Sequence, residues 1–223
     1  MIGFTDGTIR PHDPITRAQT ITMFFRALPD SVRGQYWYTN NPFADIRTGH
    51  WFNNAVSTMY NMGFAEGYLD GTFRPQGNIT NAEISALMAR FLSLDLEDHP
   101  SVFDDIGGHW AEEYINAVAA QGLVDAGGNF NPDTPITRAH TAQMFNRMDG
   151  RDPVNAYAFI YEVRQWSDNM DPNAWYFLHI MIASNSFYVI RTEDGREYWI
   201  SLADDIDWSV LERETSEPWH LLR

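Results

Sequence analysis

The sequence contains no cysteine, no lysine and no long hydrophobic run. Without cysteine there is no disulfide framework and no thiolate chemistry, so the sequence carries no information about the redox compartment. No stretch approaches the roughly 18 consecutive apolar residues that a membrane-spanning helix needs. The N-terminus also lacks the basic, apolar and small-residue succession of a signal peptide. We therefore expect no membrane insertion.

The charge balance is strongly acidic. Thirty acidic residues stand against fifteen arginines, which leaves a formal net charge of −15. This balance argues against nucleic acid or an anionic membrane surface as the main partner. Aromatic residues make up 14% of the chain, which is far too many for a disordered acidic segment. We expect the 223 residues to fold into one or two domains.

One short motif occurs three times and organises the chain. Its threonines are separated by 64 and then 57 residues, so the repeat is about 60 residues long, longer than the common helical solenoid repeats. A glycine-rich turn that ends in proline precedes each copy. The copies are Pro14-Ile15-Thr16-Arg17-Ala18-Gln19, Asn78-Ile79-Thr80-Asn81-Ala82-Glu83 and Pro135-Ile136-Thr137-Arg138-Ala139-His140.

Apolar spacing predicts a helix after each copy of the motif and another helix before each of the last two turns. Thr16 with Gln19 and Thr80 with Glu83 form the pattern of a capping box, whereas His140 is not expected to close one. The expected helices are Thr16–Leu28, a helix through Ala55 to Met62, Thr80–Leu92, a helix through Ile115 to Val118 that ends at Gly122, and Thr137–Met148.

The first repeat lacks its opening half, and the C-terminal region has a surplus one. An aromatic-x-Asp pattern begins at residues 43, 103 and 166, and tryptophan follows at 51, 110 and 175. We infer that the segment 166–190 completes the first repeat in space. A linker helix is expected at 153–165. Residues 187–202 predict a β-hairpin around Thr192-Glu193-Asp194-Gly195, and the rest is an acidic tail outside the repeats.

The pattern Phe-x-Asp-Ile, Gly-His-Trp, helix, Gly, Asp-Gly-x-Phe-x-Pro, Ile-Thr-Arg-Ala and helix resembles the S-layer homology domain. The resemblance covers about residues 3–190 and is most specific in 43–148. It implies a mainly α fold in which three helix-turn-helix units form a pseudo-threefold module. We expect a single module over 1–190, built from units 3–28 with 166–190, 43–92, 103–148 and the linker helix 153–165, and an extension over 191–223 that holds the hairpin and the acidic tail.

The resemblance also implies a function. Members of that family hold surface proteins on the bacterial cell wall by binding pyruvylated secondary wall polysaccharide in grooves between units. Their ligand arginine corresponds to Arg17 and Arg138 here, while the second unit has Asn81. Their glutamate corresponds to Gln19, Glu83 and His140.

The physical chemistry of the motif gives the arginines two interpretations. A cation at the first helical position faces the positive end of the helix dipole, so helix stability does not explain Arg17 or Arg138. Free helix amides and a guanidinium would together suit a carboxylate or phosphate. An internal salt bridge with one of the acidic side chains is the alternative. Arg26, Arg90 and Arg147, at the other end of these helices, favour the dipole and are interpreted as structural.

Trp51, Trp110 and Trp175 have two interpretations as well. Repetition in every unit favours a core position, since each unit must fill the same space. Stacking on a sugar ring is the alternative for Trp51 and Trp110, which are therefore candidate ligand contacts.

Metal and catalytic motifs are absent from the sequence. Asp168, Asp171 and Asn173 lack the glycine and terminal glutamate of a calcium loop. No nucleophile elbow, phosphate loop or dinucleotide fingerprint occurs, so we expect neither an enzyme nor a cofactor.

These observations lead to one functional hypothesis and one alternative. The hypothesis is a non-catalytic, extracellular cell-surface module that binds an acidic cell-wall polysaccharide, with other surface proteins as further candidate partners. The alternative is a degenerate repeat domain that serves as a structural or protein-interaction element without glycan.

Overall fold

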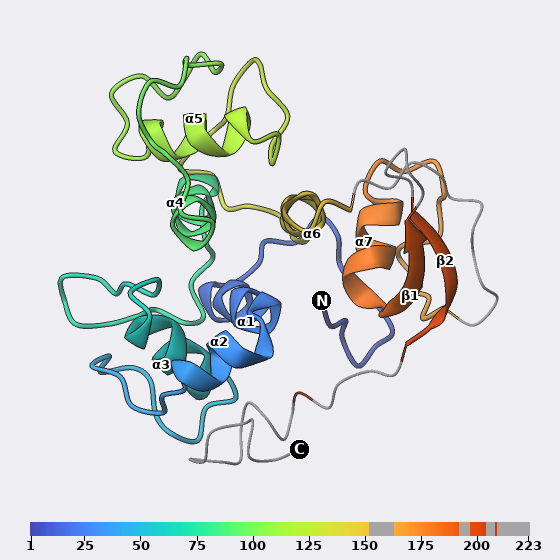
Figure 1. Ribbon diagram of the computed structural model, residues 1–223, viewed down its shortest axis with the longest axis horizontal. Helices are drawn as coiled ribbons and strands as arrows, with labels where there is room; N and C mark the ends of the chain where they lie inside the picture. The colour runs from blue at the N-terminus through green and yellow to red at the C-terminus, as the bar shows by residue number, and fades with distance from the viewer. Residues whose placement is uncertain (152–162, 192–196, 204–207, 209–223) are drawn as a thin grey trace. The chain divides into compact units, whose positions relative to one another are not determined.

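The computed structural model describes residues 1–151, 163–191, 197–203 and 208, and this part of the chain is mainly helical (Figure 1). The mainly α class and the three-repeat organisation predicted from the sequence are confirmed. The elements are α1 Arg17–Ala27, α2 Asp30–Gln35, α3 Asn53–Asn61, α4 Asn81–Phe91, α5 Glu112–Ala120, α6 Arg138–Met148, α7 Phe177–Ser184, β1 Phe187–Arg191 and β2 Glu197–Leu202.

The chain divides into two compact units. The first unit consists of Met1–Pro14, Ala119–Ala126 and Ile136–Ile206, and in it α6 packs against α7. The second consists of Ile15–Val118, Gly127–Pro135 and Asp207–Arg223, and in it α1 packs against α3. The domain boundaries expected from the sequence, at 190 and 191, stay predictions.

Local capping starts the helices that follow the repeated motif. Thr16 accepts from the Gln19 amide while Gln19 accepts from the Thr16 amide, and Thr80 and Glu83 form the same reciprocal pair. Both predicted capping boxes are confirmed. Thr137 also caps α6, by accepting from the His140 amide at 3.3 Å. A threonine oxygen thus satisfies one of the amides that every helix leaves unpaired at its start.

The first two amides of the same helices donate to carbonyls of a turn that lies far away in the sequence. Arg17 N donates to Gly77 O at 2.9 Å and Ala18 N to Pro75 O at 3.0 Å. The same two bonds occur at α4 and α6. There the pairs are Asn81 N to Thr134 O, Ala82 N to Pro132 O, Arg138 N to Asp13 O and Ala139 N to Pro11 O.

An aspartate joins the two halves of each repeat. Asp45 accepts from the amides of Phe73 and Arg74, each at 2.8 Å. Asp105 accepts in the same way from Phe130 and Asn131, each at 2.7 Å.

Asp168 makes the corresponding bonds for the first repeat. It accepts from the Ile9 amide at 2.8 Å and from the Arg10 amide at 2.7 Å. Residues from the C-terminal part of the chain therefore complete the N-terminal repeat, as the sequence predicted.

A small buried cluster supports this completion in the first unit. Ile9, Trp166 and Ile180 pack together with Ala142. Gly3 lies so close to Trp166 that an added Cβ would be 2.1 Å from the indole ring. The chain can therefore pass the ring only where it has no side chain. In the second unit the largest fully buried side chains are Phe24, Phe25, Ile15, Ile21, Met59, Ile79, Ile84, Met88, Ile106 and Ile115.

One local element differs from the sequence prediction. The sequence analysis predicted no helix at the position of α2, where Pro29 serves as the N-cap and Asp30 favours the dipole in the first turn. Arg33, 3% exposed, donates to the Leu28 carbonyl and secures this helix. The predicted hairpin is confirmed as an antiparallel pair of β1 and β2. Its turn, the helix expected at 153–165 apart from its last residues, and most of the acidic tail lie outside the described residues.

Replacing Asp168 tests the completion of the first repeat. The variant Asp168→Ala leaves the buried Ile9 amide without its acceptor, so we expect a loss of about 1–3 kcal/mol in the free energy of unfolding. Urea denaturation measures it, with Asp104→Ala, an exposed aspartate, as the control. Equal stability of the two variants would contradict the completion.

Candidate functional site

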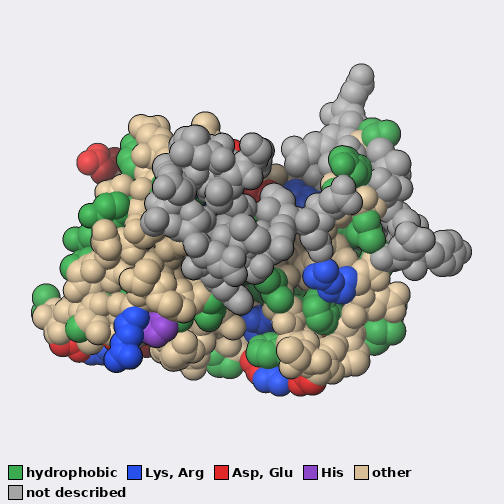
Figure 2. All heavy atoms as spheres, turned by 90° about the horizontal axis from the view of Figure 1, so that it is seen from below, with side chains coloured by type: hydrophobic (Ala, Val, Ile, Leu, Met, Phe, Trp, Pro, Cys, Tyr) green, Lys and Arg blue, Asp and Glu red, His purple; other side chains and the backbone are tan. Residues whose placement is uncertain are grey.

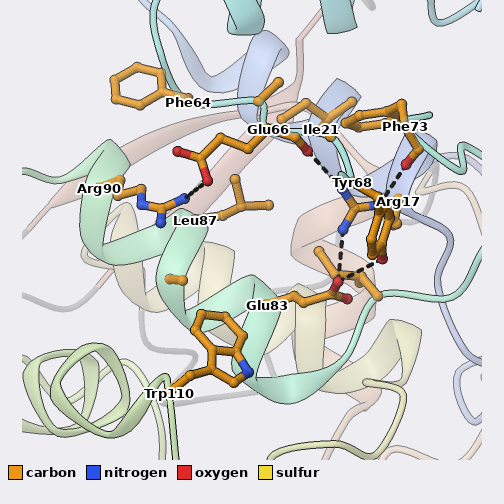
Figure 3. A pocket seen from close by; sticks show the side chains of 14 residues that line it. Arg17, Ile21, Phe64, Glu66, Tyr68, Phe73, Glu83, Leu87, Arg90 and Trp110 are labelled. Atoms are coloured by element: carbon orange, nitrogen blue, oxygen red, sulfur yellow. Dashed lines mark hydrogen bonds and ion pairs between the residues drawn. The ribbon is translucent and has the colours of Figure 1, made fainter. Parts of the chain in front are cut away.

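A groove of about 150 Å³ lies in the second unit and is named here the Arg17 groove (Figure 3). Helices α1 and α4, the segment between α3 and α4, and Trp110 shortly before α5 form its sides. Its charged and aromatic lining residues used below are Arg17, Glu66, Tyr68, Glu83, Arg90 and Trp110.

Arg17 is held from several sides. Its Nε donates to the Phe73 carbonyl at 2.9 Å, and one Nη donates to the Glu66 carbonyl at 3.0 Å. The other Nη forms an ion pair of 3.0 Å with Glu83, and the two side chains are 11% and 22% exposed. The first-turn arginine is thus paired internally, as the alternative interpretation of the sequence supposed.

Tyr68 extends this network. Its hydroxyl donates to Glu83 at 2.9 Å, and its ring lies 4.9 Å below the Arg17 guanidinium. Burial raises the pKa of Tyr68, the charge of Arg17 acts in the opposite direction, and the bond to Glu83 raises the pKa further. The phenol therefore stays a donor at neutral pH.

Arg90 lies on the opposite side of the groove from Arg17 (Figure 3). It forms an ion pair of 3.1 Å with Glu66, and the two side chains are 30% and 66% exposed. A second guanidinium nitrogen donates to the Tyr114 hydroxyl at 3.5 Å. Arg90 thus contacts solvent and the groove at once.

Trp110 is 59% exposed and lines the same groove. The core position that repetition suggested is therefore wrong for Trp110. Trp51 is partly buried and lines a separate open depression with Arg74, Pro75 and Gly77. Trp175 is 48% exposed in the first unit. The recurring tryptophan is thus exposed at two of its three positions, so recurrence alone did not indicate burial.

Arg138 is 2% exposed in the first unit. Its Nε donates to the Ile9 carbonyl at 2.7 Å and one Nη to the Ile2 carbonyl at 2.8 Å. Burial lowers the pKa of Arg138, with the charge of Asp13 acting against this. These contacts favour a structural role, and a ligand role for Arg138 stays a prediction.

Asn81 repeats part of the arginine pattern without the charge. Its Nδ2 donates to the carbonyls of Phe130 at 3.2 Å and Asn131 at 3.0 Å. The Arg17 Nε has the corresponding partner, Phe73, in the turn of its own neighbouring repeat. An amide therefore satisfies the turn carbonyls, but it cannot supply the cation that an acidic ligand would need.

The helix starts do not offer the free amides on which the anion hypothesis relied. The amides of Arg17 and Ala18 donate to carbonyls, and that of Gln19 donates to Thr16. Because α4 and α6 have the same bonds, this part of the hypothesis is corrected. An anion near the Arg17 groove would therefore find the first three amides of α1 already occupied.

On the face shown in Figure 2 the arginines among the described residues lie singly, some of them beside acidic side chains. In the Arg17 groove itself two arginines face two glutamates. An acidic ligand would therefore be attracted by local cations only, against a net charge of −15.

The comparison with known families now bears on this geometry. The family model of the S-layer homology domain matches residues 1–21, 42–84 and 102–142. These three segments are S-layer homology repeats. The three copies of the motif that starts each second helix fall in them, and so do the residues Arg17, Glu66 and Glu83 of the groove, whereas the surplus half-repeat from residue 166 lies outside.

Relatives with such repeats are large surface proteins. Cell surface glycoprotein 1 of Acetivibrio thermocellus is 30% identical over 220 residues, which is 91% of this chain and 9% of that protein. The cellulosome-anchoring protein of the same organism is 28% identical over 211 residues, 91% of this chain and 45% of that protein. The surface-layer 125 kDa protein of Lysinibacillus sphaericus is 29% identical over 152 residues, 65% of this chain and 12% of that protein. The chain thus spans less than half the length of these relatives.

In the third S-layer homology repeat a histidine replaces the glutamate of the motif. His140 Nδ1 lies 2.8 Å from Thr137 Oγ1, and its ring stacks at 4.6 Å on Trp175. Burial lowers the pKa of His140, the charge of Asp125 raises it, and His12 lowers it. A neutral ring can accept a hydrogen bond from the Thr137 hydroxyl at Nδ1, so His140 contacts the capping side chain but does not bond the Thr137 amide as Gln19 and Glu83 bond the amides of their caps.

Sequence reasoning missed three residues of the groove, Glu66, Tyr68 and Arg90. Arg90 was interpreted only as a favourable charge at a helix end. The available signal was the recurrence of an acid after the first helix of a repeat, at Glu66 and Asp125, together with an arginine near the end of the second, at Arg90 and Arg147.

The described part of the chain contains no cluster of side chains suited to a metal ion and no helix suited to cross a membrane. There, no three histidine, aspartate or glutamate side chains are placed to hold an ion. None of the helices in these residues has the length and apolar character needed to cross a membrane.

Replacing His140 tests its contact with Thr137 through the pH dependence of stability. Burial lowers the pKa of His140 below its ordinary value of 6.5. As the pH falls, His140 is therefore protonated in the unfolded chain before it is protonated in the native chain. Stability should fall as the pH drops below 6.5. His140→Gln should remove this loss and gain about 0.5–1 kcal/mol at acidic pH, with a smaller change at alkaline pH. Urea denaturation across pH measures it, with His99→Gln as the control.

Replacing Arg138 separates a structural role from a ligand role. Arg138→Met leaves two carbonyls without their donor, so we expect a loss of about 2–4 kcal/mol in the free energy of unfolding. Arg47→Met, at an exposed arginine, should change it by less than about 0.5 kcal/mol. Thermal unfolding of both variants gives the comparison, and an unaltered Arg138→Met would contradict the structural role.

Proposed function

We propose that this chain is a non-catalytic module that holds a protein at the bacterial cell wall by binding an acidic, pyruvylated wall polysaccharide in the Arg17 groove. The observation that carries the proposal is that an exposed tryptophan and two arginines line one groove. The membership of the three repeats in the S-layer homology family and the names of the surface-anchoring relatives support it.

The groove has the parts that recognition of a charged sugar requires. Trp110 offers a flat apolar face, on which the C–H face of a sugar ring can pack. The carbonyls of the turn and the Tyr68 hydroxyl lie near, and Arg90 contacts both groove and solvent. Arg17 stabilises one side of the groove through its hydrogen bonds to Glu83 and to two backbone carbonyls.

Anchoring needs no reacting group, and this agrees with the lining of the groove. Its two glutamates are each paired with an arginine, Glu83 with Arg17 and Glu66 with Arg90. Each carboxylate is thus occupied by a cationic side chain of the same groove. An extracellular location at the cell surface follows from the proposed anchoring.

One observation favours a second candidate function, a repeat domain that serves as a structural or protein-interaction element without glycan. Arg17 and Arg138 both have internal partners, and Arg138 is 2% exposed. On this account the groove would bind no wall glycan at all.

Replacing Trp110 tests the choice. We expect wild type to bind a pyruvylated disaccharide of the wall polysaccharide, and Trp110→Ala to bind it about five- to thirtyfold more weakly, since an interface tryptophan typically contributes one to two kcal/mol or more. The measurement is isothermal titration calorimetry. Tyr188→Ala, which removes another aromatic side chain that is 59% exposed, is the control and should bind like wild type.

Thermal unfolding of the three proteins completes the test. Because Trp110 is largely exposed, its removal should leave the unfolding midpoint nearly unchanged. Absence of heat with wild type would support the structural alternative, and equal affinity of wild type and Trp110→Ala would exclude this groove as the glycan site.

A further inference from the structure

The two ion pairs of the Arg17 groove differ in exposure. Arg17 and Glu83 are 11% and 22% exposed, whereas Arg90 and Glu66 are 30% and 66% exposed. Exposed ion pairs contribute little to stability because water screens the charges and both long side chains lose freedom. The Arg90–Glu66 pair is therefore the one that opens easily.

Glu83 cannot leave its arginine without disturbing the fold. Its Oε1 accepts from Arg17 and from the Tyr68 hydroxyl. Its Oε2 accepts from the Thr80 amide and closes the capping box of α4. Displacing Glu83 would break all three bonds, so a ligand carboxylate has no easy access to Arg17.

Arg90 is prepared to exchange its partner. Glu66 meets it through one oxygen at 3.1 Å, and the carboxylate of Glu66 is largely in solvent. The Tyr114 hydroxyl accepts from Arg90, and its ring lies 5.2 Å from the guanidinium. These contacts hold the arginine in place when Glu66 moves away.

The same arrangement occurs in the third repeat. Arg147 in the last turn of α6 pairs with Asp125 at 2.7 Å, and the side chains are 18% and 77% exposed. Asp125 lies three residues after Gly122, as Glu66 lies three residues after Gly63. In two repeats, therefore, a largely exposed acidic side chain is paired with a less exposed arginine at the end of the second helix.

We propose that Arg90 is the receptor for the carboxylate of the glycan and that Glu66 is a displaceable internal competitor, which an acidic sugar replaces and a neutral sugar does not. This rests on the proposed function and names Arg90 and Glu66, in place of the motif arginine Arg17, as the residues that determine charge selectivity. A neutral sugar leaves the Arg90–Glu66 pair intact, so only acidic ligands respond to changes at Glu66.

Titration calorimetry with two probes tests this. The probes are a pyruvylated wall disaccharide and the same disaccharide after removal of its pyruvyl group. Glu66→Gln should bind the acidic probe about two- to fivefold more tightly than wild type, since it abolishes a weak competing pair. Arg90→Gln should bind it at least about tenfold more weakly, and Arg90→Lys should recover part of the loss. None of these changes should alter binding of the neutral probe.

Glu97→Gln is the matched control, because it removes one exposed negative charge outside the groove. Equal affinity of Glu66→Gln and Glu97→Gln for the acidic probe would overturn the competitor role of Glu66. If wild type still binds the acidic probe in that case, the proposed function stands. Unchanged affinity of Arg90→Gln, with its unfolding midpoint preserved, would overturn the receptor role. If wild type and all variants bind neither probe, the proposed function fails and this inference with it.

Discussion

The pair of hydrogen bonds at the start of α1, α4 and α6 is the constraint on which the other features depend. In each pair, the first two amides of the helix donate hydrogen bonds to carbonyls of a turn from another part of the chain. A single repeat therefore cannot satisfy its own helix, because an unpaired buried amide costs free energy. The repeats must therefore fold together. Asp45, Asp105 and Asp168 each accept from amides of a turn and so hold the carbonyls of that turn in place for the helix.

This constraint also explains the arginine of the repeated motif. A cation at the first helical position is unfavourable for the dipole, but the same turn that accepts the helix amides offers carbonyl oxygens to the guanidinium. Arg17 and Arg138 donate to such carbonyls, and Asn81 does so with its amide. The side chain at this position of the motif thus bonds to the turn of a neighbouring repeat at all three helix starts.

The sequence predicted those parts of the fold that depend on neighbouring residues. Threonine with glutamate or glutamine three positions later gave the capping boxes, and the apolar spacing gave the helices. The first repeat lacks an opening half and the C-terminal region has a surplus one, so the sequence indicated that the two belong together. Asp168 lies in that surplus half and bonds the turn of the first repeat. Helix α2 was missed, since Pro29 was interpreted only as the end of the preceding helix and not as the N-cap of the next.

The sequence alone determined that three S-layer homology repeats are present, where their second helices begin and that the last segment completes the first repeat. Only the tertiary structure decided which side chains pair with one another and which line the Arg17 groove. Arg17 meets Glu83 across 66 residues and Arg90 meets Glu66 across 24, and no local pattern specifies such pairs. The exposure of Trp110 was likewise settled by what packs beside it, because a repeated tryptophan has the same local sequence whether it fills a core or lines a groove.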